Sequence, residues 1–194
     1  MKCIVTAGPT YEPVDEVRRL TNFSTGRLGT RLANRLRADG HSTTLLLGHY
    51  ATFREADAGV TVIPFTTTQS LLELLEAAAR DAEEPVGAVF HAAAVSDFSV
   101  AALYRRDSEG RMEPISGRKI PTRDGSLWAE LTPTPKILPK LRSWYPHAWI
   151  VGWKYEMDGD RADAVARGRD QLRSCATDGC VVNGLAYGPG FGFV

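Results

Sequence analysis

The fold is decided at the start of the chain, by the stretch Met1-Lys2-Cys3-Ile4-Val5-Thr6-Ala7-Gly8-Pro9-Thr10 and the later stretch Asn22-Phe23-Ser24-Thr25-Gly26-Arg27-Leu28-Gly29. Residues 3–7 predict a buried strand, and residues 28–38 predict a helix with one apolar face. A small, glycine-containing turn opens that helix, which Ser24 or Thr25 would cap. Free backbone N–H groups at such a helix start attract phosphate. The opening therefore indicates a strand–turn–helix unit with a phosphate site; a cap with packing glycines is the alternative.

Short apolar runs and helical patterns keep alternating along the chain. The predicted strands are residues 43–47, 60–64, 87–95, 149–153 and 180–183, and the predicted helices are residues 69–82, 135–142 and 161–176. Gly40 would end the first helix, because glycine tolerates the left-handed conformation of a C-cap. This alternation predicts an α/β fold: a Rossmann-like, doubly wound, mainly parallel sheet with right-handed crossovers. Residues 1–194 are expected to form one nucleotide-binding domain.

The segment 96–132 interrupts this alternation. It is polar, irregular and rich in arginine, and extended pieces are predicted at 112–115 and 127–131. Connections of that length are usually functional or disordered. We therefore predict that residues 99–132 form a lid or a dimerisation arm, with a loop of no consequence as the alternative.

Composition narrows the class of protein. The chain has 194 residues, and its 23 basic residues balance 23 acidic ones, which gives no argument for nucleic-acid or acidic-membrane partners. Three cysteines without a regular framework argue against a secreted disulfide scaffold. The sequence has neither a signal-peptide pattern nor an apolar run of about 20 residues. A cytoplasmic protein with no membrane and no nucleic-acid partner is expected.

Candidate binding residues lie where the strands of a parallel sheet end, which is where ligands bind in such folds. Ala93 and Ala94 are small and would leave room for a flat ligand, while Asp97 would bond a ribose hydroxyl or a metal, or cap a turn. His91 precedes them and is expected to be a core histidine. Lys119 lies in the long segment and would close over a phosphate or face water. The first turn matches neither G-x-G-x-x-G nor G-x-x-x-x-G-K-[ST].

Taken together, these segments resemble the phosphopantothenate–cysteine ligase (phosphopantothenoylcysteine synthetase) family. The matching motifs are TAGPT at 6–10, D-x-V-R at 15–18, N-x-S-[ST]-G-x-x-G at 22–29, A-A-V-[AS]-D at 93–97, K-I-x-[SK] at 119–122, P-x-I-L at 135–138 and G-F-x-x-E-T at 152–157. Trp153 replaces a phenylalanine, Met157 replaces a threonine, and Gln171 stands where some members have lysine. No flavin-binding decarboxylase domain precedes Met1, so the chain resembles the stand-alone type.

The resemblance implies a two-step ligation of 4′-phosphopantothenate and cysteine in coenzyme A biosynthesis. The carboxylate would attack the α-phosphate of a nucleotide and release pyrophosphate, and the cysteine amine would then attack the acyl-nucleotide. By similarity to stand-alone bacterial members, CTP is favoured over ATP. Magnesium would offset phosphate charge, and its protein ligands are not predicted. The resemblance also implies a homodimer across which the long segment reaches.

The resemblance further implies roles for individual residues. Asn22 and Lys119 would be catalytic, with Asn22 and Arg18 contacting the pantothenate substrate and Lys119 neutralising charge at the α-phosphate. The implied nucleotide-binding residues are Gly8, Ser24, Thr25, Gly26, Ala93, Ala94, Asp97, Pro135, Lys136, Ile137, Leu138, Trp153 and Arg167.

Two other readings of the fold stay open. One is a Rossmann-type NAD(P)-binding oxidoreductase, and the other is a catalytically degenerate nucleotide-binding protein. A short-chain dehydrogenase would carry a Tyr-x-x-x-Lys pair, and no lysine follows four residues after Tyr104, Tyr145, Tyr155 or Tyr187. Release of pyrophosphate that depends on both phosphopantothenate and nucleotide would separate a ligase from a binding protein.

Overall fold

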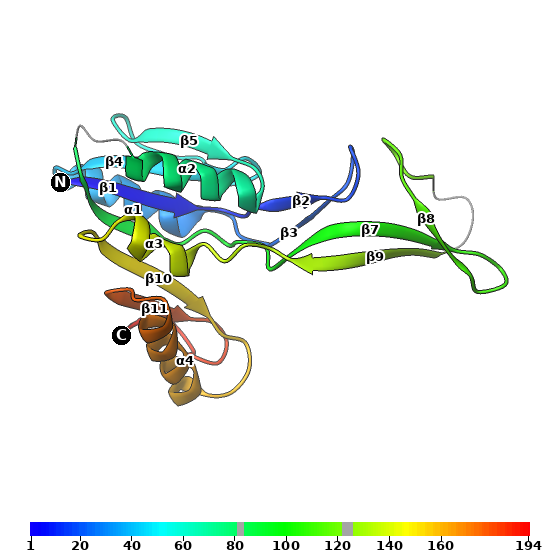
Figure 1. Ribbon diagram of the computed structural model, residues 1–194. Coiled ribbons are helices and arrows are strands. Elements are labelled where there is room, and N and C mark those ends of the chain that lie inside the picture. Colours follow the sequence, from blue (N-terminus) through cyan, green and yellow to red (C-terminus); the bar gives the residue numbers. More distant parts are fainter. Residues whose placement is uncertain (81–83, 122–125) are drawn as a thin grey trace.

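The computed structural model describes residues 1–80, 84–121 and 126–194 (Figure 1). The largest of its sheets has seven strands in the order β12-β11-β10-β6-β1-β4-β5. These strands are β1 (Lys2–Ala7), β4 (Ser42–Gly48), β5 (Thr61–Phe65), β6 (Val86–His91), β10 (Trp149–Tyr155), β11 (Gly179–Asn183) and β12 (Gly192–Phe193). All neighbours are parallel except β11 and β12. The prediction of a mainly parallel, doubly wound sheet is confirmed.

Helices cover the two faces of this sheet unequally. Side chains alternate between the faces of a strand, so Val5 packs with helix α1 (Arg27–Ala38), whereas Ile4 packs with α2 (Thr68–Arg80) and α3 (Leu138–Trp144). Helix α4 (Arg161–Ser174) packs on β11 through Gly168, whose Cα lies against Val182. The chain moves one way from β1 to β4 and the other way from β10 to β11, and right-handed crossovers then place α1 opposite α4. Among the described residues, no helix is both long and apolar enough to cross a membrane.

The predicted element ends differ from the observed ones at functional turns. Strand β6 ends at His91 rather than at 95, because residues 92–95 leave the sheet and Ala94 pairs with Pro9. Helix α3 begins at Leu138 rather than at 135. Gly40 ends α1 as expected, with φ of 87°. The last residues of the helix predicted at 69–82, and position 122 of the K-I-x-[SK] motif, lie outside the described residues. The hairpin of β2 (Tyr11–Pro13) and β3 (Arg19–Thr21) was not predicted.

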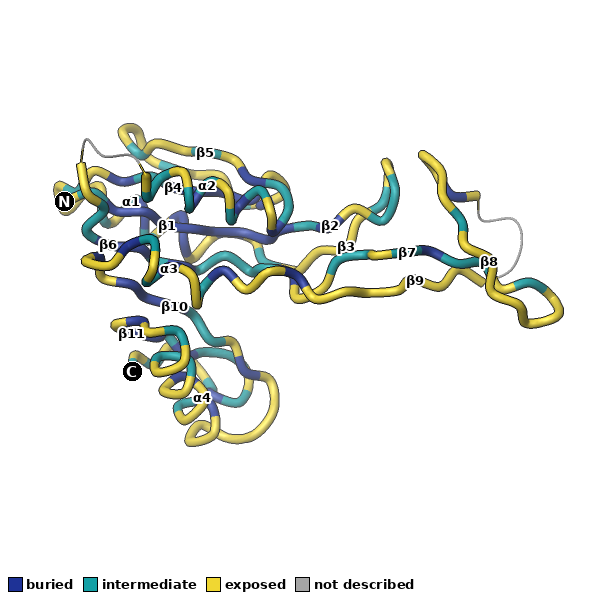
Figure 2. Tube along the Cα trace, in the orientation of Figure 1, coloured by how far each residue is buried: buried dark blue, intermediate teal, exposed yellow. Residues whose placement is uncertain are grey.

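Most described residues of the long segment belong to an antiparallel sheet, which corrects the prediction that the segment is largely irregular. We call it the arm: β7 (Phe98–Arg106), β8 (Met112–Ile115) and β9 (Ser126–Pro133), in the order β8-β7-β9. The predicted extended pieces at 112–115 and 127–131 fall on β8 and β9. All eight residues of β9 are exposed, and the arm projects away from the buried strands of the main sheet (Figure 2). Strand β7, at the centre of the arm, has no strict alternation of buried and exposed residues, so the sequence pattern did not reveal it.

Helix α1 approaches the end of β1 closely at Gly29. A Cβ atom on Gly29 would lie 2.5 Å from the Cβ of Ala7 and 3.0 Å from the carbonyl oxygen of Thr6. Both neighbours are fixed by the sheet, so a side chain at this position would push the helix start away from the strand end. The third glycine of the opening stretch therefore serves packing, and it sets the position of the turn before it.

We expect Gly29→Ala to lower the free energy of unfolding. Helix propensity alone would favour alanine by up to about 1 kcal/mol, but overpacking against fixed backbone costs about 1–3 kcal/mol. Urea denaturation measures the difference, and Gly117→Ala is the control because a Cβ there meets nothing within 4 Å. A Gly29→Ala protein as stable as the control would contradict the close approach.

Candidate functional site

The turn after β1 and the turn after β6 are joined by backbone hydrogen bonds. The amide of Ala94 donates to the carbonyl of Gly8 at 3.0 Å, and the amide of Thr10 donates to the carbonyl of Ala94 at 3.1 Å. Gly8 adopts the left-handed conformation, with φ of 81°. Thr10 and Ala94 are 84 residues apart in the sequence. The motifs that contain them thus form one surface at the carboxyl edge of the sheet.

The start of α1 completes this surface. The N-cap is Gly26, with φ of 81° and no side-chain cap hydrogen bond, so the expectation that Ser24 or Thr25 caps the helix is wrong. The Thr25 hydroxyl instead accepts from the amide of Arg27 at 3.3 Å. A Cβ on Gly26 would lie 3.4 Å from the Cα of Gly8 and 3.0 Å from the Cβ of Ala51. The two predicted phosphate-binding glycines therefore lie close together, and a Cβ at either position would crowd the Cβ of Ala51, at 2.9 Å from Gly8 and 3.0 Å from Gly26.

Asn22 reaches the same surface from the end of β3. Its amide Nδ2 donates to the carbonyl of Ala94 at 3.2 Å, and the neighbouring Thr21 hydroxyl donates to the carbonyl of Thr10 at 2.8 Å. Asn22 is exposed, so its amide is open to a ligand while one hydrogen bond holds its orientation. The structure thus brings together Gly8, Gly26, Asn22 and Ala94, which are four of the predicted site residues.

A cavity of about 590 Å³ adjoins this surface between α3, α4 and the segment that follows β6. Its lining includes eight of the predicted nucleotide-binding residues, namely Ala93, Asp97, Pro135, Lys136, Ile137, Leu138, Trp153 and Arg167. Gly152 lets side chains of the two helices pack closely on β10, because a Cβ there would lie 2.7 Å from Nε2 of Gln171 and 3.0 Å from Cδ2 of Leu138, both of which line the cavity. The cavity is thus formed where a glycine in β10 passes beneath two helices.

Basic and acidic side chains both line the cavity. Lys136, Lys154 and Arg167 line it. Lys136 pairs with Asp97, and the buried carboxylate of Glu156 pairs with Arg167 and lies 3.3 Å from Nζ of Lys154. Burial works against ionisation of Glu156, but the hydrogen bonds from Arg167 and Lys154 outweigh it and lower its pKa. Glu156 therefore holds two cations at the mouth of the cavity.

Buried hydroxyls fix the segment that carries Asp97. The Thr10 hydroxyl donates to Oγ of Ser96 at 3.2 Å and accepts from the amide of Ser96 at 2.8 Å. The amide of Thr134 donates to the carbonyl of Asp97 at 3.0 Å. Asp97 is thereby held between the turn after β1 and the segment that leads into α3. Sequence reasoning missed this network, and also Lys154 and Glu156; the motifs at 6–10 and 152–157 were the signal.

Arg18 and Lys119 lie apart from the cavity lining, at the tip of the β2–β3 hairpin and in the segment after β8. Arg18 pairs with Asp15 at 2.6 Å, and Lys119 is exposed. Ser24 and Thr25 lie beside Gly26 in the loop before α1. The predicted residues therefore fall into three groups: those of the surface around Gly8 and Gly26, which we call the glycine surface, those that line the cavity, and Arg18 and Lys119.

A family model described as the DNA/pantothenate metabolism flavoprotein C-terminal domain matches residues 1–193. The chain belongs to this family. The bifunctional coenzyme A biosynthesis protein CoaBC of Thermococcus kodakarensis is 29% identical over 188 residues, which cover 96% of this chain and 42% of that protein. A cysteine/cysteine sulfinic acid decarboxylase of an unknown prokaryotic organism is 32% identical over 193 residues, which cover 99% of this chain and 48% of that protein.

A solved structure adds a ligand-bound member to this comparison. A Cab2 mutant in complex with phosphopantothenate-cysteine matches with a TM-score of 0.74 at 25% identity, covering 100% of this chain and 76% of that one. The chain described here spans less than half the length of the two curated relatives. The likeness therefore covers the domain described above and leaves the other part of those relatives unmatched.

His91 is buried beside the cavity, as expected of a core histidine, and its Nδ1 lies 3.0 Å from the Thr6 hydroxyl. Burial disfavours the imidazolium ion and lowers its pKa from 6.5 to about 4. Below pH 6.5 the unfolded chain binds a proton that the folded chain does not bind until about pH 4. The contribution of His91 to stability is therefore complete above the unfolded pKa and is lost as the pH falls through this window.

We expect acidification from about pH 7 to about pH 4 to remove about 3 kcal/mol of stability through His91 alone. His91→Gln keeps a polar contact for Thr6 but does not titrate, so its free energy of unfolding should depend less on pH. Urea denaturation at both pH values measures this, with the exposed His147 changed to Gln as the control. Parallel pH profiles for wild type and His91→Gln would sink the prediction.

Proposed function

We propose that this chain is the ligase that joins 4′-phosphopantothenate to cysteine with the help of a nucleotide. The observation that carries the proposal is the convergence of Asn22 and Gly8 on the Ala94 backbone, with Gly26 close to Gly8, beside a cavity whose lining includes basic side chains. Family membership supports it, as do a relative named for coenzyme A biosynthesis and a structural match whose ligand is phosphopantothenate-cysteine.

The chemistry requires two anions to meet. In the first step a carboxylate oxygen of phosphopantothenate bonds to the α-phosphorus, the bond from that phosphorus to the bridging oxygen breaks, and pyrophosphate leaves. In the second step the cysteine amine bonds to the acyl carbon, the carbon–oxygen bond breaks, and the nucleoside monophosphate leaves while the amine loses a proton. Such steps depend on orientation and charge stabilisation rather than on a nucleophilic side chain.

The position of each residue in the structure suggests which part of the reaction it would assist. The Asn22 amide, already oriented by Ala94, would hold the acyl group, and Lys119 would stabilise charge at the α-phosphate. The backbone amides around Gly8, Ser24, Thr25 and Gly26 would receive phosphate oxygens. The cavity would take base and ribose, with Lys136 and Arg167 supplying positive charge. Arg18 remains a candidate substrate contact.

A second observation, the unpaired indole N–H of Trp153 among the described residues, also supports nucleotide binding in the cavity. The indole N–H of Trp153 is buried and, among the described residues, has no hydrogen-bond partner. A ligand acceptor would satisfy this donor, which the phenylalanine of the family pattern lacks. We propose CTP as the nucleotide in preference to ATP, on the family resemblance. The three thiols are unpaired, which accords with a reducing, cytoplasmic setting.

Magnesium would be held mainly by the phosphates. Within residues 1–80, 84–121 and 126–194 no group of three or more His, Cys, Asp or Glu residues is arranged to hold a metal. This suits magnesium, which commonly binds through substrate phosphates and one or two carboxylates. Asp97, exposed at the cavity, is the carboxylate placed to contribute, and the metal would supply neutralisation of phosphate charge.

The direct test is pyrophosphate release by the purified chain. Release should require both 4′-phosphopantothenate and a nucleoside triphosphate, and cysteine should yield the ligated product. Nucleotide binding without release would identify a catalytically degenerate binding protein. Reduction or oxidation of a nicotinamide cofactor in place of ligation would identify an oxidoreductase.

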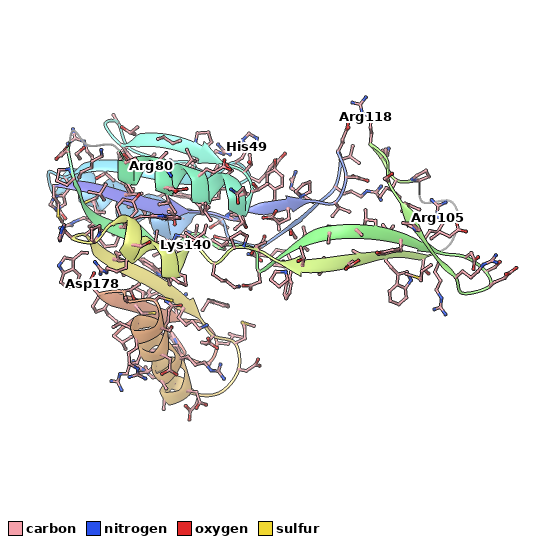
Figure 3. All side chains as sticks on the ribbon, in the orientation of Figure 1. His49, Arg80, Arg105, Arg118, Lys140 and Asp178 are labelled. Atoms are coloured by element: carbon pink, nitrogen blue, oxygen red, sulfur yellow. The ribbon has the colours of Figure 1, made fainter. Side chains whose placement is uncertain are left out.

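We expect Lys119→Gln to slow pyrophosphate release at saturating substrates by about a hundredfold, the range of one lost electrostatic donor. Nucleotide affinity should fall only modestly, because the lysine charge acts where charge accumulates in the transition state. Lys140→Gln, an exposed lysine of α3, is the matched control (Figure 3). Equal losses in binding and turnover would make Lys119 a ground-state contact, and wild-type turnover would remove it from the site.

We further propose a homodimer formed through residues 99–132. Strand β9 is exposed along its whole length and lies at an edge of the arm, and exposed edges favour pairing with another chain. Light scattering should report a dimer that Trp128→Lys weakens. Trp149→Lys, at a residue of similar exposure outside the arm, should leave it intact. A monomer at all working concentrations would refute the proposal.

A further inference from the structure

The tip of the β2–β3 hairpin is organised by one carboxylate. Oδ1 of Asp15 accepts from the amides of Val17 at 3.0 Å and Arg18 at 2.8 Å, and Oδ2 accepts from Nε of Arg18 at 3.0 Å. The amide of Val14 donates to the carbonyl of Arg18 at 2.8 Å, which closes the turn. These contacts are local and would account for Asp15 as a turn residue.

The same carboxylate also reaches a segment that is 105 residues away in the sequence. Oδ2 of Asp15 accepts from the amide of Ile120 at 3.2 Å, and Nη2 of Arg18 donates to the carbonyl of Ile120 at 2.6 Å. Both polar backbone atoms of Ile120 are therefore bound by one ion pair. We call this set the latch: Asp15, Arg18 and the backbone of Ile120.

Lys119 is bracketed by hairpin contacts on both sides. The latch holds Ile120, whose side chain is buried, and the amide of Glu16 donates to the carbonyl of Arg118 at 3.0 Å. Arg118 extends toward the hairpin tip in Figure 3, and its Nε lies 2.8 Å from the carboxylate of Glu16. Lys119 itself stays exposed. Its backbone is thus fixed, and among the described residues no hydrogen bond or ion pair holds its ammonium group.

The ion pairs Asp15–Arg18 and Glu16–Arg118 contribute unequally to the stability of this contact. The Asp15 side chain is only 1% exposed. Its burial works against ionisation, but the hydrogen bonds from Ile120, Val17 and Arg18 outweigh it and hold its pKa well below the usual range. Glu16 and Arg118 are both exposed, and exposed pairs contribute little. The latch, rather than the outer pair, therefore holds the segment.

We propose that Asp15 is a positioning residue that acts through Lys119, an inference that rests on the proposed function. Strand β3 runs directly from the latch to Asn22, which is bonded to the Ala94 carbonyl. One short hairpin therefore sets the position of both proposed catalytic groups. Arg18, implied by resemblance to contact substrate, is turned toward Ile120 and has its part in the same latch.

A double-mutant cycle tests this directly. Asp15→Asn removes the charge that binds Arg18 and Ile120, so pyrophosphate release at saturating substrates should fall about tenfold or more, with nucleotide KM changed less than about threefold. In the Lys119→Gln background the same change should have an effect below about threefold, because the group that Asp15 positions is already gone. An equal loss in both backgrounds would overturn the proposal, as would wild-type turnover of Asp15→Asn.

Asp107→Asn is the matched control. Asp107 accepts from the amides of Glu109 and Arg111 and from Nε of Arg111, each at 2.9 Å, which repeats the local contacts of Asp15 without a bond to residues 117–120. Its turnover should equal that of wild type. A loss as large as that of Asp15→Asn would show that any such turn matters and would overturn the specific role.

Hydrogen exchange keeps the test decisive if Asp15→Asn does not fold. The Ile120 amide of the wild-type protein should exchange slowly, since its hydrogen is bound to a buried carboxylate. Exchange at the rate of an unstructured peptide would overturn the latch whatever the variant does. A protected Ile120 amide in a protein without ligase activity would retain the latch and reject the proposed function, so the two failures are distinguishable.

Discussion

Three hydrogen bonds at the backbone of Ala94 hold the candidate site together. Its amide binds the carbonyl of Gly8, and its carbonyl accepts from the amide of Thr10 and from the side chain of Asn22. Strands β1 and β6 are neighbours in the sheet, but their adjacency alone would not fix the loops beyond their ends. The Ala94 contacts extend the order of the sheet into those loops, where a ligand would bind.

The remaining parts of the site depend on that junction. Gly8 and Gly26 approach each other closely, so the start of α1 is placed relative to Ala94. The Thr10 hydroxyl fixes Ser96 and hence the segment that carries Asp97. The cavity begins at Ala93 and continues beneath α3 and α4. A single backbone position therefore relates the glycine surface, the amide of Asn22 and the cavity.

The sequence predicted the strands and helices whose buried residues recur in a regular pattern along the chain. Strands covered by helices read as continuous apolar runs, so the core of the main sheet was identified from strands such as β1 and β4. The three-residue strands β2 and β3 were missed because they are too short for any periodicity. Strand β7 was missed because its burial does not alternate regularly along the strand.

For the site residues too, the sequence predicted local patterns but not contacts between distant segments. Motif resemblance pointed to Asn22 and Asp97 because each lies inside a short continuous pattern. The role of Gly152 depends on Leu138 and Gln171, and the long-range contact of Asp15 depends on Ile120. Neither relation can be read from neighbouring letters, because it exists only after distant segments have been brought together by the fold.

The Ala94 junction also bears on what substitution can and cannot reveal about this site. Every contact that it makes there is made by main-chain atoms, so most replacements of its side chain would leave those contacts in place. Proline is the exception, since it has no amide hydrogen to donate. The fold can thus tolerate other side chains at a position central to its architecture, even though a flat ligand would favour a small one there, so the mutational tolerance of stability is a poor guide to importance wherever backbone atoms make the contacts.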